Sequence, residues 1–394
     1  MIQRTLAPKL RAIADLYPVV VVTGPRQSGK TTLCRATFPD LPYVSLEPLD
    51  AREFARTDPR GFLRQYGAGA VIDEVQNAPD LLSYLQADVD DNPTAGRFIL
   101  TGSQHFGLSH TVSQSLAGRA GMLELLPPSL EELRRFPTAP SDLFTTLWSG
   151  SYPRIFDRGI PAQRWLADYV TTYVERDVRH VLRVGDLSTF AIFIRLCAGR
   201  TAQESNLTDV GADAGVSHVT ARAWLSVLES SYLCFRVPAW HRNLRKRLVK
   251  SAKLHFVDTG LVCYLLGIRD PEQLATHPLR GAIFETWVAA EVYKQRVHQG
   301  LPPALHHLRA ARGDEIDLVV EGGERLVLVE AKSGATASTD AITRLARLAA
   351  AVTAAGEGDR RPVEARVVFG GDRAQDRSDV AVVPWAEMPL NAWD

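Results

Sequence analysis

The segment GPRQSGKTT, residues 24–32, has the residue types and the spacing of a loop that binds a polyphosphate. Its two glycines let backbone amides turn toward phosphate oxygens at a helix N-terminus. Its lysine reaches the outer phosphates, and the threonine hydroxyl that follows can ligate Mg²⁺. The residues expected to bind the nucleotide are Gly24, Pro25, Arg26, Gln27, Ser28, Gly29, Lys30, Thr31 and Thr32.

Two acids follow an apolar stretch in GAVIDEVQ and supply what such a loop needs next. Asp73 would complete the magnesium site, and Glu74 would orient and deprotonate the water that attacks the γ-phosphate. An acid pair after a strand can also simply begin a loop. Polar residues end a further apolar stretch, RFILTGSQ, where we expect Thr101 or Ser103 to sense the γ-phosphate.

Arg119 stands directly before another apolar stretch, in SLAGRAGMLELL. In AAA-type ATPases, an arginine at this kind of position reaches the nucleotide of a neighbouring subunit and stabilises transition-state charge. The alternative is a salt bridge within its own domain. The first interpretation predicts a homo-oligomer, and the second makes no prediction about assembly.

A second group of acids lies near the C-terminus, in EIDLVV and LVLVEAKSG. Glu330 and Lys332 are two positions apart, so a strand directs both to one face. Together with Asp317, and with Glu285 on a preceding helix, they could bind Mg²⁺ or Mn²⁺ for phosphodiester hydrolysis. Glu330, Asp317 and Glu285 would be metal ligands, and Lys332 would handle the attacking water. The pattern alone is weak, because strand hairpins match it by chance.

The elements that position these residues follow from periodicity. Four valines, residues 19–22, form a buried strand before the phosphate loop, as in a parallel sheet. Residues 127–200 show helical spacing and are expected to form a lid. Residues 207–236 are typical of a helix-turn-helix with a wing, in which Ser217 caps a recognition helix and His218, Thr220 and Arg222 face outward. Such a module binds DNA or serves as a protein-packing domain. From residue 281 on, we expect a helix, three strands, a helix and two strands.

Local charge identifies candidate nucleic-acid surfaces. Residues 236–253 contain seven lysines and arginines and no acid, and Trp240 among them could stack on a base. The alternative is a basic hairpin packed on an acidic domain. Arg176, Arg179 and Arg183 recur at about one-turn spacing and could face DNA, although such a stripe is more often a solvated helix face.

Composition limits the remaining possibilities. The 394 residues carry 45 basic and 45 acidic side chains, so net charge does not indicate a polyanionic partner. The four cysteines are too scattered for a disulfide framework or a cysteine-rich zinc site. The sequence has neither a long apolar run nor the apolar centre of a signal peptide. We therefore expect a cytoplasmic protein without membrane attachment.

The motifs GPRQSGKTT, VIDEVQ, LTGSQ and SLAGR, in this order, resemble a bacterial and archaeal family of AAA-type P-loop ATPases. Members of that family usually end in a domain that resembles PD-(D/E)XK nucleases. The resemblance implies an α/β fold with a P-loop parallel-sheet domain (1–126), a helical lid (127–200), a winged-helix domain (201–275) and a restriction-endonuclease-like domain (276–394). In this sequence Ile316 replaces the proline of the nuclease motif.

The preferred hypothesis is an ATP-hydrolysing, DNA-binding enzyme whose C-terminal domain cuts DNA with a divalent metal. The cofactors would be ATP and Mg²⁺, with Mg²⁺ or Mn²⁺ at the second site. The alternative is an ATP-controlled switch, in which a catalytically inactive nuclease-like domain binds DNA or protein. The retention of Asp317, Glu330 and Lys332 favours the first hypothesis.

Overall fold

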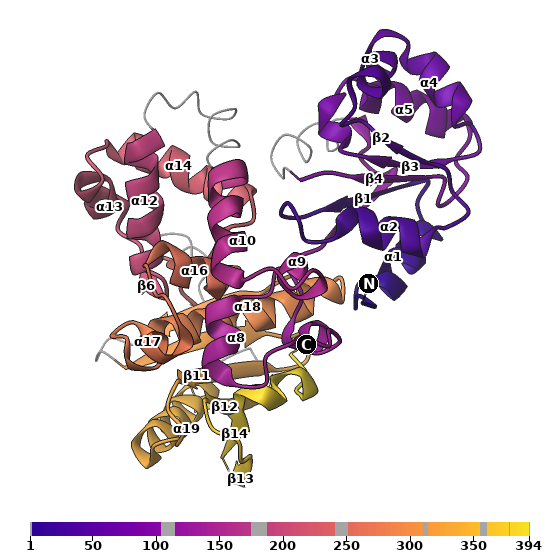
Figure 1. Ribbon diagram of the computed structural model, residues 1–394. Helices are drawn as coiled ribbons and strands as arrows, with labels where there is room; N and C mark the ends of the chain where they lie inside the picture. The colour runs from indigo at the N-terminus through magenta and orange to yellow at the C-terminus, as the bar shows by residue number, and fades with distance from the viewer. Residues whose placement is uncertain are drawn as a thin grey trace. The chain divides into compact units, whose positions relative to one another are not determined.

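The computed structural model describes residues 2–103, 115–174, 187–240, 251–309, 314–354, 361–377 and 379–393. The chain forms two compact units (Figure 1). The first unit comprises Met1–Pro128, Ser230–Tyr232 and Val297–Gly300. The second comprises Ser129–Glu229, Leu233–Arg296 and Leu301–Asp394.

The first unit contains a parallel five-stranded sheet in the order β2-β3-β4-β1-β5. Its strands are β1 (Val19–Thr23), β2 (Tyr43–Ser45), β3 (Ala70–Asp73), β4 (Phe98–Thr101) and β5 (Ala120–Glu124). Because the strands are parallel, their carboxyl ends meet at one edge, where α/β sheets bind ligands. The phosphate loop follows β1, and β4 lies between β1 and the strand that ends in Asp73.

Strand β1 is buried on both faces, which explains its uninterrupted run of valines. Val20 and Val22 share a core with α1 (Ala7–Ala14) and α2 (Lys30–Thr37). Val19 and Val21 belong to a second core on the opposite face (Figure 1). Three helices contribute to that second core, α3 (Leu49–Thr57), α4 (Pro59–Gln65) and α5 (Leu81–Asp91).

The second unit begins with a series of helices, as the helical spacing of residues 127–200 predicts. They are α7 (Leu130–Leu133), α8 (Leu143–Ser149), α9 (Pro153–Asp157), α10 (Ala162–Tyr169) and α12 (Leu187–Gly199). A π-helical turn, Val170–Val174, follows α10 directly. The arginine stripe Arg176, Arg179 and Arg183 lies outside the described residues.

The predicted helix-turn-helix corresponds to α13 (Leu207–Asp213) and α14 (His218–Ser230). Ser217 caps α14 as expected, because its hydroxyl accepts a 3.1 Å hydrogen bond from the Thr220 amide. His218 and Arg222 are exposed on this helix, and Thr220 is half-buried. Three strands accompany the helices in the order β6-β8-β7, namely β6 (Gln203–Glu204), β7 (Cys234–Val237) and β8 (Lys253–Phe256).

The C-terminal elements follow the predicted order of helix, three strands, helix and two strands, with one further strand, β13, before the last. The helices of this region are α16 (Thr259–Leu265), α17 (Pro271–Thr276), α18 (Arg280–His298) and α19 (Thr339–Ala354). The sheet order is β13-β14-β12-β11-β10-β9. Its strands are β9 (Leu305–Arg309), β10 (Glu315–Glu321), β11 (Leu326–Lys332), β12 (Val363–Phe369), β13 (Gln375–Arg377) and β14 (Val380–Pro384), followed by a 3₁₀ helix, Trp385–Leu390.

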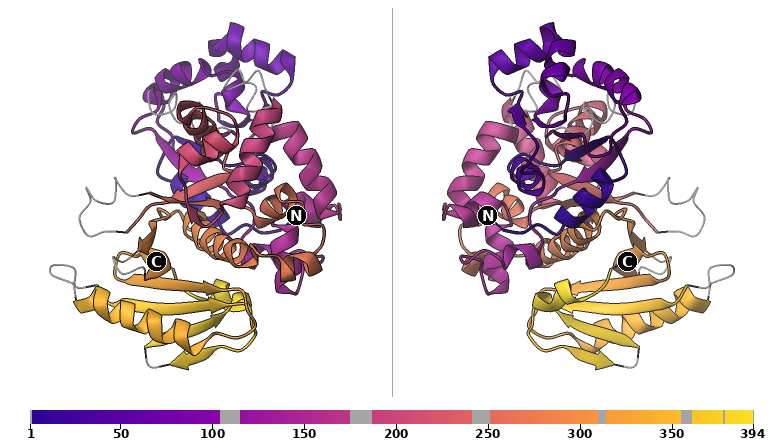
Figure 2. Two further views of the ribbon diagram at one scale, coloured as in Figure 1. Left: turned by 90° about the vertical axis from the view of Figure 1, so that its left-hand side faces the viewer. Right: turned by 90° about the vertical axis from the view of Figure 1, so that its right-hand side faces the viewer.

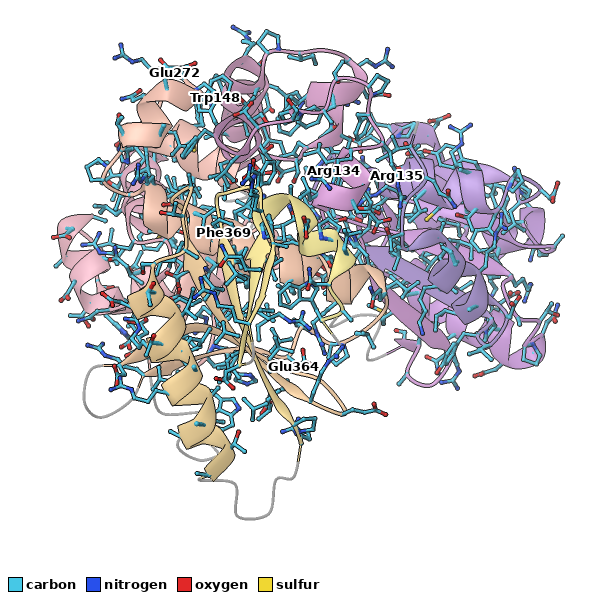
Figure 3. The ribbon with its side chains drawn as sticks, turned by 90° about the horizontal axis from the view of Figure 1, so that it is seen from below. Arg134, Arg135, Trp148, Glu272, Glu364 and Phe369 are labelled. Atoms are coloured by element: carbon cyan, nitrogen blue, oxygen red, sulfur yellow. The ribbon has the colours of Figure 1, made fainter. Side chains whose placement is uncertain are left out.

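This sheet is antiparallel from β9 to β11 and parallel from β11 through β12 to β14. Helix α19 lies against one face of this sheet (Figure 2). Its Ile342, Leu345 and Leu348 side chains belong to the core there. Figure 3 shows Phe369 and Glu364 near opposite ends of β12. Phe369 belongs to the core under α19, whereas Glu364 pairs with arginines on the partly exposed end of the strand.

The cysteines and the hydropathy of the helices relate to the environment in which the chain folds. All four cysteines are buried and free of disulfides. Across the described ranges, no helix combines the length and the hydropathy needed to cross a bilayer.

Asp258 joins two segments of the second unit that are distant in sequence. Its carboxylate caps α16 by accepting the Leu261 amide at 3.0 Å, and it accepts the Ser151 amide at 2.7 Å. The Ser151 hydroxyl also donates to it at 3.1 Å. The backbones approach so closely here that a Cβ on Gly260 would lie 2.7 Å from the Gly150 nitrogen. Asp258 therefore holds α16 against the segment that follows α8.

We expect Asp258→Ala to lower the free energy of unfolding by about 3 kcal/mol. The change removes a helix cap, worth about 1 kcal/mol, and leaves the buried amide of Ser151 without its acceptor, which costs a further 1–3 kcal/mol or so. Urea unfolding followed by tryptophan fluorescence measures this loss. Asp270→Ala is the matched control, because Asp270 caps α17 at an exposed position through Gln273 alone. Equal losses of unfolding free energy in the two variants would contradict the role of Asp258 in holding α16 against the segment after α8.

Candidate functional site

The phosphate loop has the backbone conformation that its glycines allow. Gly24 and Gly29 have φ angles of 145° and 98°, and Gln27 between them also has a positive φ of 65°. A Cβ on Gly24 would lie 2.1 Å from the carbonyl oxygen of Leu125, so only glycine fits there. Lys30, Thr31 and Thr32 then form the first turn of α2, behind the loop.

Lys30 lies at the centre of this loop. Its ammonium donates to the carbonyl oxygens of Gly24, at 3.0 Å, and Pro25, at 2.7 Å. Burial lowers the pKa of Lys30 to about 8, although the charges of Glu74 and Asp73 oppose this shift. The loop thus holds a cation where outer phosphates would bind, with carboxylates nearby.

Asp73 is the acceptor for three hydroxyl groups. Thr31 donates to its two carboxylate oxygens at 3.1 and 3.0 Å, and Tyr43 donates at 2.9 Å. Thr101, at the end of β4, donates to the same carboxylate. Hydroxyl and carboxylate oxygens are the donors that Mg²⁺ prefers, so Thr31 and Asp73 could hold this ion. Tyr43 is the first residue of β2 and was not predicted to take part in this site.

Glu74 follows directly in a left-handed conformation, with φ of 56°. The side-chain amide of Gln76 donates to Glu74, and it also donates to the Ser103 hydroxyl at 3.3 Å. Gln76 therefore links the candidate base to the polar end of β4. Gln76 was not predicted as a site residue, although it lies in the same motif as Glu74.

Arg4 supports the phosphate loop from behind and was not predicted. Its guanidinium donates at 2.7 Å to the Ser28 carbonyl oxygen in the loop. It also donates at 2.7 Å to the Leu126 carbonyl oxygen, which follows β5. No local motif marks this arginine, because these two acceptors are backbone atoms far along the sequence.

Arg119 forms an intradomain ion pair with Asp90 on α5. Its Nε lies 2.5 Å from one carboxylate oxygen, and its Nη2 lies 2.8 Å from the other. This hydrogen bond lowers the pKa of Asp90. This ion pair is the intradomain salt bridge that was the alternative interpretation of Arg119. The role of Arg119 as an arginine finger stays a prediction.

The C-terminal candidates come together in the second unit. Lys332 and Glu330 lie on one face of β11, as the alternation predicts, with Lys332 Nζ 2.6 Å from Glu330 Oε1. Asp317 on β10 accepts the Ala331 amide at 2.8 Å, beside an irregularity in the pairing of β10 with β9. Burial and the neighbouring charge of Glu330 raise the pKa of Asp317 to about 6.

Two cations that the sequence does not place with these acids also face them. Lys253, on β8, lies 2.8 Å from Glu285 and 3.9 Å from Asp317. Arg344, on α19, pairs with Glu330. Burial, together with the charge of Asp317, raises the pKa of Glu285 to about 8 despite the opposing effect of Lys253. The acids thus form one cluster, but each is already in contact with a cation or an amide.

This cluster has oxygen donors suited to Mg²⁺ or Mn²⁺. However, no group of three or more histidine, cysteine, aspartate or glutamate residues is arranged to hold a metal ion within the described part of the chain. Metal binding by Glu285, Asp317 and Glu330 would therefore require rearrangement of their present partners.

The structure describes only the ends of the basic segment 236–253. Arg236 pairs with Glu229 at 2.6 Å, and Lys253 is buried. Residues 241–250, which carry the other five cations, lie outside the described residues. The prediction that Trp240 stacks on a base is wrong for this state, because its ring is buried in the core under α19 and its Nε1 donates to Glu321 at 2.9 Å.

Comparison with known proteins identifies the family. Uncharacterized protein Rv2008c of Mycobacterium tuberculosis and uncharacterized protein Mb2031c of Mycobacterium bovis are each 30% identical to this chain over 394 residues. Each match covers 98% of this chain and 84% of the relative. The chain belongs to their family. We refer to it as the Rv2008c family.

Family models match three successive parts of this Rv2008c-family member. Residues 16–134 match an AAA domain, which confirms an AAA-type P-loop ATPase domain. Residues 140–272 and 280–388 match two domains of unknown function, DUF8612 and DUF4143. These two descriptions name no reaction, so the nuclease assignment rests on the residues of the chain itself.

Two solved structures resemble parts of the Rv2008c-family chain. The Walker-type ATPase PABY2304 of Pyrococcus abyssi is 15% identical, with a TM-score of 0.45 over 66% of this chain and 94% of that chain. AMPPCP-bound DnaA from Aquifex aeolicus is 16% identical, with a TM-score of 0.30 over 57% and 85%. At these scores neither structure defines the arrangement of the whole chain.

We expect Gly24→Ala to weaken ATP binding about tenfold or more, because its Cβ collides with the Leu125 backbone and distorts the loop. Titration with a fluorescent ATP analogue measures the change. Gly118→Ala is the control, since Gly118 also has a positive φ, of 76°, but has open space around its Cα. Unchanged affinity in the Gly24 variant would show that the loop does not bind the nucleotide as inferred.

Proposed function

We propose that this Rv2008c-family protein binds and hydrolyses Mg-ATP, and that ATP controls DNA cleavage by its C-terminal domain. The observation that supports ATP hydrolysis most strongly is the shared carboxylate of Asp73. It receives the hydroxyl of Thr31 from the phosphate loop and the hydroxyl of Thr101 from β4, and the candidate base Glu74 follows it directly.

In this mechanism, the ammonium of Lys30 leaves its loop carbonyls and binds the β- and γ-phosphates. Glu74 accepts a proton from a water whose oxygen bonds to the γ-phosphorus, while the bond from that phosphorus to the bridging oxygen breaks. The products are ADP and inorganic phosphate. Thr31 and Asp73 would hold Mg²⁺, which when bound offsets negative charge on the phosphates. Ser103, held by Gln76, would contact the γ-phosphate.

Glu74→Gln should lower kcat for ATP hydrolysis by about 10²–10⁴-fold and leave ATP affinity nearly unchanged, because it removes a proton acceptor and no phosphate contact. Lys30→Ala should abolish both binding and turnover. Phosphate release and analogue binding measure the two effects. Glu53→Gln, an exposed acid on α3, is the control. Normal turnover in both test variants would refute hydrolysis at this loop.

The second part of the proposal is DNA cleavage by the C-terminal domain. It is supported by the proximity of three acids and a lysine, namely Glu285, Asp317, Glu330 and Lys332. Mg²⁺ or Mn²⁺, when bound by such carboxylates, polarises the phosphodiester and lowers the pKa of water. Lys332 would orient the attacking water and offset charge on the phosphate. The exposed residues of α14 and the five cations within 241–250 would bind the DNA backbone.

A non-cleaving switch is the second candidate, and it also has support. Lys253, Lys332 and Arg344 already neutralise the acids, as in a cluster that stabilises a fold rather than one that binds metal. In that case ATP would control the binding of DNA or protein.

An arginine finger would require Arg119 to leave Asp90 and reach the nucleotide of a neighbouring subunit in an ATP-bound homo-oligomer. Measurement of the mass in solution with and without ATP tests whether such an oligomer forms.

Labelled single- and double-stranded DNA, incubated with Mg²⁺ or Mn²⁺ and with or without ATP, separates the two candidates. We expect Asp317→Asn to reduce cleavage about 100-fold or more, because it removes a metal ligand. Asp340→Asn, an exposed acid on α19, is the matched control and should cut normally. If no condition yields cleavage, or if Asp317→Asn cuts as fast as the unchanged chain, the switch is the better interpretation.

A further inference from the structure

Lys253 places an internal cation among the carboxylates of the C-terminal cluster. Its Nζ lies 2.8 Å from Glu285 Oε1, 2.6 Å from Glu315 Oε1 and 3.9 Å from Asp317 Oδ1. The side chain is almost fully buried, with 4% of it exposed. A buried lysine with three acidic neighbours is held by charge as well as by packing.

The lysine and the acids come from different parts of the second unit. Lys253 opens β8, in the segment matched by DUF8612, whereas Glu285, Glu315 and Asp317 belong to the segment matched by DUF4143. The contact therefore joins two family segments at the group of acids that a nuclease would need. The basic segment 236–253 ends at Lys253, and it therefore contributes one of its seven cations to this interior position instead of to a surface.

The charges of the cluster are nearly balanced. Its four acids, Glu285, Glu315, Asp317 and Glu330, face three cations, Lys253, Lys332 and Arg344. With all groups ionised, one negative charge remains, and two would remain without Lys253. A divalent cation would neutralise two negative charges, and it would need the oxygens of Glu285 and Asp317 that now face the ammonium.

We propose that Lys253 competes with divalent metal for the carboxylates of Glu285 and Asp317. This inference rests on the proposed role of those acids as metal ligands. In the present arrangement the ammonium occupies the cluster, and the metal binds only when the ammonium withdraws. Lys253 is a positioning residue in this scheme, because it sets when the ligands are available and does not touch the phosphodiester.

Mn²⁺ binding measured by electron paramagnetic resonance, without nucleotide or DNA, tests the competition. Lys253→Met removes the charge and keeps the length, so it should bind Mn²⁺ about tenfold or more tightly than the unchanged chain. Adding Asp317→Asn to this variant should abolish the gain. Lys294→Met is the matched control, because Lys294 is an equally buried lysine paired with Glu291 outside the cluster, and it should show no gain.

A second measurement uses the unchanged chain, in case Lys253→Met does not fold. Saturating Mn²⁺ should increase acetylation of Lys253 by an amine-reactive reagent, as quantified by mass spectrometry, by about tenfold relative to Lys294. Lysine labelling that is unaffected by bound Mn²⁺, or a gain in affinity that survives Asp317→Asn, would overturn the competition. Tight Mn²⁺ binding without DNA cleavage would instead reject the nuclease proposal and leave the competition intact.

Discussion

The hydrogen bonds to the Asp73 carboxylate join the elements that form the nucleotide-binding edge of the first unit. This carboxylate gathers hydroxyls from the first turn of α2, from the first residue of β2 and from the last residue of β4. These elements meet only because β4 lies between β1 and β3 in a fully parallel sheet. A different strand order would separate Thr101 from Asp73, and the phosphate loop would lose its link to the rest of the sheet edge. The strand order therefore determines which hydroxyl groups can reach the Asp73 carboxylate at the edge of the sheet.

Burial of charge determines the corresponding arrangement in the second unit. Carboxylates in a protein interior are costly unless cations or amides compensate them. Here Glu330 receives Lys332 and Arg344, Glu285 receives Lys253, and Asp317 receives the amide of Ala331. The compensation comes from several elements. The pairs of Lys253 hold β8 against α18 and β10, and the pair of Arg344 with Glu330 holds α19 against β11. The same pairings oppose the entry of any further cation.

Much of both sites could be predicted from the sequence where a local repeat or motif sets the geometry. The phosphate loop, the acid pair and the shared face of Glu330 and Lys332 all depend on residues close in sequence. Tyr43, Gln76 and Arg4 were missed because their roles arise from tertiary contacts that leave no local pattern. Lys253 lies in a basic segment of the sequence, and no local pattern indicates that its side chain is buried among acids.

Trp240 illustrates the opposite error. Composition suggested a surface that binds nucleic acid, but an indole among basic residues has no periodic signal that separates exposure from burial. Its place in the core under α19 depends on the pairing of residue 239 with residue 307, far along the chain. The order of elements in the C-terminal region is likewise predictable only in part, since β13 has three residues and no apolar run.

The position of Lys253 also has a consequence for how the chain folds. Sequence patterns and family models both place a boundary between residues 272 and 280, yet the buried ammonium lies before it and its carboxylate partners lie after it. A protease cut at that boundary followed by separation of the fragments would leave uncompensated charge inside each. We therefore expect the two matched segments to unfold together, because neither can bury its share of these charges without the other.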